Sequence, residues 1–88
     1  MAYGVAAHAE GSNTKAFANY SHTNGQGTIA RGIAQTVIGT YNEEDNNALF
    51  IIGNGTADNS RSNALMVTRD GRVVIPNSSN IDNYLVTK

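Results

Sequence analysis

The polar and apolar positions of residues 1–57 repeat with a period of 14 residues. Four-residue segments align at this spacing, and each of them ends in glycine: His8-Ala9-Glu10-Gly11, His22-Thr23-Asn24-Gly25, Thr36-Val37-Ile38-Gly39 and Phe50-Ile51-Ile52-Gly53. Two further columns agree with this spacing: Thr14, Thr28, Asn42 and Thr56, and Ala6, Tyr20, Ala34 and Ala48. A repeat this short predicts two short strands per 14-residue coil, each followed by a tight corner.

Small residues recur every seven positions, and we expect them to mark the corners. This set comprises Gly4, Gly11, Ala18, Gly25, Gly32, Gly39, Asn46 and Gly53. A period of seven is also typical of coiled coils, but glycine costs a helix about 1 kcal/mol relative to alanine, so glycine in nearly every heptad excludes that structure. Asparagine fits the corner set because it tolerates left-handed backbone better than most residues do.

The repeat ends after Asn54, and the remaining sequence predicts three segments. Residues 58–63 form a polar connector loop after the repeats of residues 1–57. In residues 64–76, two apolar runs flank Asp70 and Gly71, which predicts a β-hairpin cap with these residues in a two-residue primed turn, closed by Pro76. Residues 77–88 form a polar tail with a strand start expected at residues 84–86, and we interpret the tail as a boundary within a longer protein.

The composition indicates that one chain alone has too small a core. Only 20 of the 88 residues are Ile, Val, Leu, Phe or Met, whereas Gly and Asn together account for 21. Ordering the chain costs on the order of 130 kcal/mol at about 1.5 kcal/mol per residue. The small number of large apolar side chains offsets too little of this cost. Four coils about 4.8 Å apart also leave strand edges open at both ends. We therefore expect an obligate oligomer.

Charge and cysteine content exclude several classes of function. A net charge of −1, with scattered lysine and arginine, provides no basic surface for nucleic acid or an anionic membrane. No apolar run approaches the roughly 20 residues of a membrane-spanning helix, and residues 1–4 lack the features of a signal peptide. Zero cysteine excludes a disulfide framework or a thiolate metal cluster. We expect no nucleic-acid partner, no membrane insertion and no cofactor.

The repeat resembles a known family of trimeric surface proteins. Residues 36–39 (Thr-Val-Ile-Gly) and the Ala/Gly corners resemble the head repeats of trimeric autotransporter adhesins, which form the YadA-like left-handed parallel β-roll. Residues 7–14 and 20–25 are more similar to repeats in tail-fibre and neck-appendage proteins of phages and prophages of Gram-positive bacteria. Residues 52–64 and 67–73 resemble the connector that follows those repeats. The adhesin heads have apolar residues where this chain has His8, Glu10, His22 and Asn24.

The resemblance implies an all-β homotrimer, intertwined or side by side, with about four 14-residue coils of a left-handed parallel β-roll or β-solenoid and a hairpin cap. It implies a structural and receptor-facing segment of a phage tail fibre or appendage in the virion, contributing to attachment to a cell-surface glycan. The alternative is the head domain of a bacterial cell-surface adhesin that binds host matrix. We expect outward loops at residues 40–47 and 54–63, with these receptor-facing candidates: Tyr41, Asn42, Glu43, Glu44, Asp58, Asn59 and Arg61.

Two histidines are the main candidates for a metal site. His8 and His22 lie one coil apart in the same column, so we expect their rings to stack about 5 Å apart. Three chains would bring six imidazoles together, which suits a metal ion. We favour a polar ladder in which each histidine pairs with Glu10 or Asn24, because zinc and nickel sites normally need a third ligand.

We interpret the other candidate binding and catalytic sites as structural features. Residues 53–56 (Gly-Asn-Gly-Thr) lack the lysine and helix of a phosphate loop and read as a corner. Residues 43–45 and 58–60 offer oxygen ligands for calcium but match no calcium-binding repeat, so we interpret them as solvated loops. The chain lacks a nucleophile elbow, and we expect no enzyme, ranking a polysaccharide-acting segment built on residues 43–45 lowest. We expect the aromatic residues to pack in the core or between chains rather than form a sugar-stacking rim: Tyr3, Phe17, Tyr20, Tyr41 and Phe50.

Overall fold

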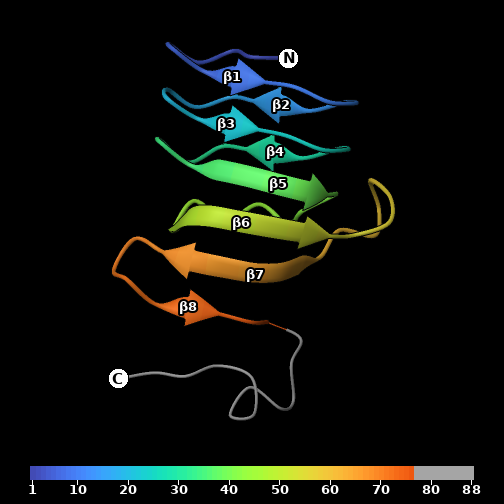
Figure 1. Cartoon of the computed structure of the whole chain (residues 1–88), viewed down its shortest axis with the longest axis vertical. Coiled ribbons are helices and arrows are strands. Elements are labelled where there is room, and N and C mark those ends of the chain that lie inside the picture. Colours follow the sequence, from blue (N-terminus) through green and yellow to red (C-terminus); the bar gives the residue numbers. More distant parts are fainter. Residues whose placement is uncertain (77–88) are drawn as a thin grey trace.

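The computed structural model describes residues 1–76, which form an all-β structure of mostly parallel, short strands (Figure 1). The eight strands are β1 (His8–Ala9), β2 (Lys15–Ala16), β3 (His22–Thr23), β4 (Ile29–Ala30), β5 (Thr36–Thr40), β6 (Ala48–Asn54), β7 (Asn63–Thr68) and β8 (Val73–Val74). Within the described residues there are no helices, and hence none that is long and apolar enough to cross a membrane. The predicted C-terminal tail and the strand start expected at residues 84–86 lie outside the described residues.

The strands form two sheets of unequal size. The larger sheet has six strands in the order β1-β3-β5-β6-β7-β8, and the smaller one contains only β2 and β4. Pairing is parallel from β1 to β6 and between β2 and β4, and it becomes antiparallel at β7 and β8. In Figure 1 the chain descends one strand at a time from the N-terminus, and β7 runs back against the direction of β6.

The 14-residue period of the sequence is the register of the parallel pairing. In the larger sheet, one ladder joins His8, His22, Thr36 and Phe50 in that order. In the smaller sheet, Lys15 pairs with Ile29. The predicted alignment of the repeats is therefore confirmed as strand register, because each residue lies beside its equivalent one period later.

The interior is made of small side chains that become larger toward β6. One column facing inward consists of Ala9, Thr23, Val37 and Ile51, of which the last three are fully buried. Ala16 and Ala30 are also fully buried, and Met66 packs against the cluster formed around Val37 and Ile51. Alternate residues from His8 onward point outward, so His8 in β1 and Glu10 just after it are exposed. The polar residues that depart from the adhesin repeats thus do not occupy the interior.

The smaller sheet stops one strand earlier than the period predicts. A third strand would align Glu44 with the fully buried column of Ala16 and Ala30, one period after Ala30. Burying an ionised carboxylate in that column is strongly unfavourable. Residues 43–47 instead form a loop, in which Glu44 is exposed. Four predicted repeats therefore contribute four parallel strands to one sheet and only two to the other.

The predicted corner residues differ between the two half-periods. Gly11, Gly25 and Gly39 have φ angles of 102°, 111° and 97°, and a Cβ on any of them would lie 2.0–2.3 Å from the carbonyl oxygen of the glycine one period later. Glycine is required there by both backbone conformation and close stacking. In the other half-period, the presence of Asn46 suggested left-handed backbone at the predicted corner residues. The structure shows none at these positions: Gly4, Ala18, Gly32 and Asn46. The left-handed residues lie two positions after the first three of these: Ala6, Tyr20 and Ala34.

The hairpin forms where the sequence predicts it, but its turn is longer than expected. The carbonyl oxygen of Thr68 accepts a hydrogen bond from the Gly71 amide (3.0 Å), and Thr68 N donates to Arg72 O (2.8 Å). Gly71 has a φ of 89°, whereas Asp70 is not among the residues with positive φ. The prediction of a two-residue primed turn is therefore wrong, and a three-residue loop with glycine in the left-handed position joins β7 to β8. The Thr68 hydroxyl, aided by Arg72, holds the pKa of the Asp70 carboxyl below its usual value.

Candidate functional site

His8, Glu10 and His22 form a cluster on the outer face of the larger sheet, close to the N-terminus. The direct pairing of His8 with His22 brings the two imidazole centroids to 4.6 Å, with the ring planes inclined by 32°. Glu10 lies two residues after His8 and therefore on the same face of the sheet. Its Oε1 lies 3.7 Å from His8 Nε2 and 3.5 Å from His22 Nε2.

This cluster is open to solvent. The side chains of His8, Glu10 and His22 are 60%, 53% and 40% exposed. One ligand atom from each side chain lies within 4.8 Å of the other two, and no other group in residues 1–76 brings three histidine or acidic ligand atoms together in this way. The expected ring separation of about 5 Å agrees with the structure, and Glu10 contacts both rings rather than one.

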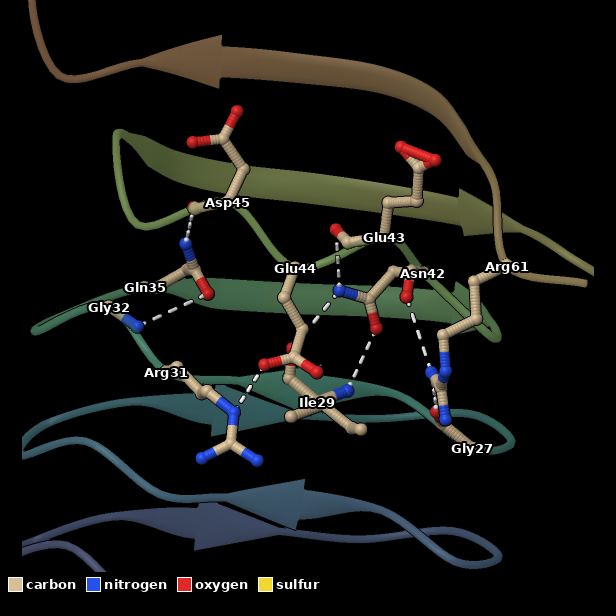
Figure 2. Close-up of polar contacts among 10 residues, drawn as sticks. All are labelled: Gly27, Ile29, Arg31, Gly32, Gln35, Asn42, Glu43, Glu44, Asp45 and Arg61. Atoms are coloured by element: carbon tan, nitrogen blue, oxygen red, sulfur yellow. Dashed lines mark hydrogen bonds and ion pairs between the residues drawn. The ribbon is translucent and has the colours of Figure 1, made fainter. Parts of the chain in front are cut away.

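A second polar cluster closes the smaller sheet, and its central residue is Asn42 (Figure 2). The Asn42 side-chain oxygen accepts a hydrogen bond from Ile29 N (2.8 Å), and its amide nitrogen donates to Ile29 O (3.0 Å) and to Glu43 O (3.1 Å). A side-chain amide carries the same donor and acceptor as a peptide group. Asn42 therefore satisfies the edge of β4 where the next backbone strand would otherwise lie.

Asn63 acts in the same way one step further along the chain. Its side-chain oxygen accepts a hydrogen bond from Glu43 N (2.8 Å), and its amide nitrogen donates to Glu43 O (3.0 Å). Both Asn42 and Asn63 are buried. Two buried amides thus connect β4, the 43–47 loop and β7 through bonds that mimic a sheet ladder.

Gln35 and two arginines complete this closing network. The Gln35 amide nitrogen donates to Asp45 O (2.6 Å) and Ala48 O (2.8 Å). Arg61 donates to Gly27 O (2.8 Å), to Asn42 O (3.2 Å) and to the Asp58 carboxylate (2.7 Å). Figure 2 shows Gln35 and Arg61 on opposite sides of Asn42. Arg69, in the hairpin loop, donates to Asn46 O (2.9 Å) and Ile33 O (2.7 Å).

Sequence interpretation missed the structural roles of Gln35, Asn63 and Arg69. Asn42 and Gln35 occupy repeat columns that hold threonine or serine in the preceding repeat. At both positions a hydroxyl side chain is replaced by a longer amide in the repeat that precedes the missing strand. This replacement was the sequence signal that could have revealed the cap. Asn63 and Arg69 follow the repeat and carry no such signal.

The structure corrects part of the predicted receptor-facing set. Asn42 is fully buried, the side chain of Arg61 is only 18% exposed, and Tyr41 is half-buried with its ring against Gly27. These three residues close the fold, so they do not present side chains to a ligand as expected. The candidates that do lie on the exposed surface are Glu43, Glu44, Asp58 and Asn59.

The predicted aromatic residues do not form one rim. Tyr3 and Phe17 stack with centroids 4.7 Å apart and planes inclined by 7°, and the Arg31 guanidinium lies 4.1 Å from the Phe17 ring centroid. Arg31 also donates a hydrogen bond to Glu44. Tyr20 is exposed at a corner, whereas Tyr41 and Phe50 are half-buried. Tyr3, Phe17 and Arg31 therefore form a continuous column.

A cavity of about 530 Å³ lies beside this column and is lined by Arg31, Gly32, Ile33, Asn46 and Arg69. Its two guanidinium groups are already bound to groups of this chain. Arg31 pairs with Glu44, and Arg69 donates to two backbone carbonyl oxygens. Arg69 thus joins the hairpin loop to the repeat, and neither guanidinium of the cavity is left without a partner.

Exposed large apolar residues occur at one corner in three successive repeats. Val5, Tyr20 and Ile33 belong to three successive repeats and are 65%, 60% and 59% exposed. These corners stack directly, since Tyr20 N donates to Val5 O (2.9 Å) and Ala34 N donates to Asn19 O (2.9 Å). We call Val5, Tyr20 and Ile33 the corner stripe.

Comparison of the chain with protein-family models, with curated proteins and with solved structures finds no match.

Proposed function

We propose that this chain is a structural segment of a homotrimeric phage tail fibre or appendage, and that its parallel strands belong to a left-handed β-roll. The corner stripe carries this proposal. Exposed apolar residues occur at one corner in three successive repeats, and these corners stack on one another through backbone hydrogen bonds. Exposed apolar residues on stacked corners suit contact with identical chains lying side by side.

The small interior supports the same conclusion. The buried apolar residues among those described are Ala16, Ile29, Ala30, Val37, Ala48 and Ile51, and half of them are alanine. Burial stabilises by about 25 cal/mol per Å² of apolar surface, so alanine contributes little. Additional burial between chains would compensate for this small interior.

Attachment to a cell surface is the second part of the proposal. In a trimer packed through the corner stripe, the exposed residues Glu43, Glu44, Asp58 and Asn59 lie on loops outside the strands. Exposed loops on a rigid scaffold commonly carry recognition. Polar side chains there suit hydrogen bonding to a cell-surface glycan.

Light scattering of the purified chain at micromolar concentration tests the proposal. We expect three times the mass of one chain. The double variant Val5→Glu, Ile33→Glu should be monomeric, because each chain would bring two carboxylates into the contact without partners. The matched control is Val73→Glu, since Val73 is 42% exposed on β8 and outside the corner stripe. It should remain trimeric, and a monomeric wild-type chain would contradict the proposal.

A further inference from the structure

We propose that His8, Glu10 and His22 of a single chain bind one divalent transition-metal ion, with zinc as the best fit. The proposal goes beyond the proposed function and is independent of it, because all three ligands come from the same chain. The register of β1 and β3 is its structural basis. A 14-residue period places His22 beside His8, and the two-residue alternation of a strand places Glu10 on the same face.

The distances between the ligand atoms suit a small ion. In a tetrahedral zinc site with bonds of about 2.0–2.1 Å, neighbouring ligand atoms lie roughly 3.3 Å apart. Glu10 Oε1 lies 3.5 Å and 3.7 Å from the two Nε2 atoms. The largest separation within the group is at most 4.8 Å, and a small rotation of exposed side chains closes it.

The ligand atoms are available for coordination. Within the described residues, the side chains of His8, Glu10 and His22 make no hydrogen bond. The Glu10 carboxylate lies 3.5 Å or more from both Nε2 atoms. Coordination would therefore break no bond of the fold. It would also hold the Glu10 carboxylate between the two rings, where it already lies.

The donor set selects among metals. Two imidazole nitrogens and one carboxylate suit zinc, nickel, cobalt and iron, whereas calcium and magnesium prefer sites made of oxygen ligands. Three protein ligands leave a fourth tetrahedral position open for water or an external ligand. The chemistry thus predicts zinc or nickel binding and no binding of calcium.

The sequence restricts the site to the first two repeats. In the next two repeats, the histidine column continues with Thr36 and Phe50. The Glu10 column holds Asn24 in the second repeat and continues with Ile38 and Ile52. None of these side chains is a usual zinc ligand. We therefore expect one ion per chain.

A bound ion would join β1 to β3 where the fold is least supported. These strands pair over only two residues each, and the interior beneath them holds Ala9 and Thr23. β5 and β6, by comparison, pair over five residues above Val37 and Ile51. The ion would fix the N-terminal repeats and raise the unfolding temperature of the chain.

Calorimetric titration of the metal-free chain with zinc chloride tests the site. We expect one ion per chain, and His8→Ala, His22→Ala and Glu10→Gln should each weaken binding. Loss of even an outer partner of a ligand costs about 10- to 100-fold in affinity, so each loss of a direct ligand should cost at least about tenfold. Glu43→Gln is the matched control, because it removes the same charge from an exposed loop outside the cluster. It should bind like the wild type.

Thermal unfolding with and without zinc provides the second measurement. The wild type and Glu43→Gln should melt at higher temperature with zinc, and the three ligand variants should not. Circular dichroism of each variant checks that the strands persist. We expect them to persist because the three substituted side chains are exposed. Unchanged affinity in the ligand variants would overturn the proposal. A stoichiometry of one ion per three chains would also overturn it, since the ligands would then come from different chains.

Discussion

The two sheets begin alike and end differently. Both are built by parallel pairing in the same 14-residue register. The larger sheet continues through β6 into an antiparallel hairpin, whereas the smaller sheet stops at β4. A repeating β structure needs a device that stops pairing at each end, because open edges recruit further strands.

The difference shows two ways of satisfying a strand edge. At β6 another backbone strand, β7, satisfies the edge through an antiparallel ladder that contains register shifts, and β8 then forms the last ladder of the sheet. At β4 the side chain of Asn42 supplies the hydrogen bonds with Ile29. A change of strand direction needs a connection of several residues, whereas an amide cap needs one residue. Here the choice follows from Glu44, which makes a third strand of the smaller sheet unfavourable.

Replacement of a stacked glycine should have the largest effect and break the repeat itself. In Gly25→Ala the new Cβ would lie 2.0 Å from Gly39 O, and the φ of 111° is strained for alanine. We expect a loss of more than about 4 kcal/mol in unfolding free energy, or failure to fold. Gly71→Ala is the control, because its φ is also positive but nothing lies within 4 Å of the added Cβ.

Gly71→Ala should cost only about 1–2 kcal/mol, the price of a left-handed alanine. Urea denaturation at equal protein concentration measures both variants, since assembly makes stability concentration-dependent. Equal losses would show that backbone conformation alone, and not close stacking of the repeats, requires glycine.

Removal of the amide cap should have the next largest effect and opens the edge of β4. Asn42→Leu leaves the Ile29 amide and carbonyl without their partner, so we expect a loss of about 2–4 kcal/mol in unfolding free energy. Asn59→Ala, at an exposed loop position, should change it by less than about 0.5 kcal/mol. Urea denaturation compares the two, and a small effect of Asn42→Leu would mean that the edge needs no cap.

The smallest effect on unfolding free energy is expected from substitutions of buried threonines inside the repeats. They compare a buried hydroxyl that has no hydrogen-bond partner with one that has a partner. Thr23 is fully buried, and its hydroxyl is the one buried side-chain polar atom in residues 1–76 without a hydrogen-bond partner. Thr23→Val should therefore stabilise the chain by about 1 kcal/mol.

Thr28→Val is the matched change at a buried threonine whose hydroxyl donates to Asn24 O (3.2 Å). It should destabilise by about 1 kcal/mol. Thermal unfolding of both variants measures the difference, and shifts of the same sign would contradict this assignment.

Much of the repeat was predictable because its physical requirements are local and periodic. Alignment of the glycine-ended segments gave the strand register, and it also gave the approach of His8 to His22. The turn after Thr68 was predicted one residue too short, since Asp-Gly suits both two-residue and three-residue loops. Left-handed backbone at Ala6, Tyr20 and Ala34 had no signal, because alanine and tyrosine rarely adopt it.

The sequence by itself determined the all-β class, the 14-residue register and the need for glycine at Gly11, Gly25 and Gly39, because parallel strands in register place each residue on its own equivalent. Tertiary structure alone decided which distant residues close the stack. Asn63 reaches Glu43, and Arg69 reaches Ile33, across 20 and 36 residues that share no period. Such contacts depend on where the chain leaves the repeat, and a repeating pattern carries no information about that path.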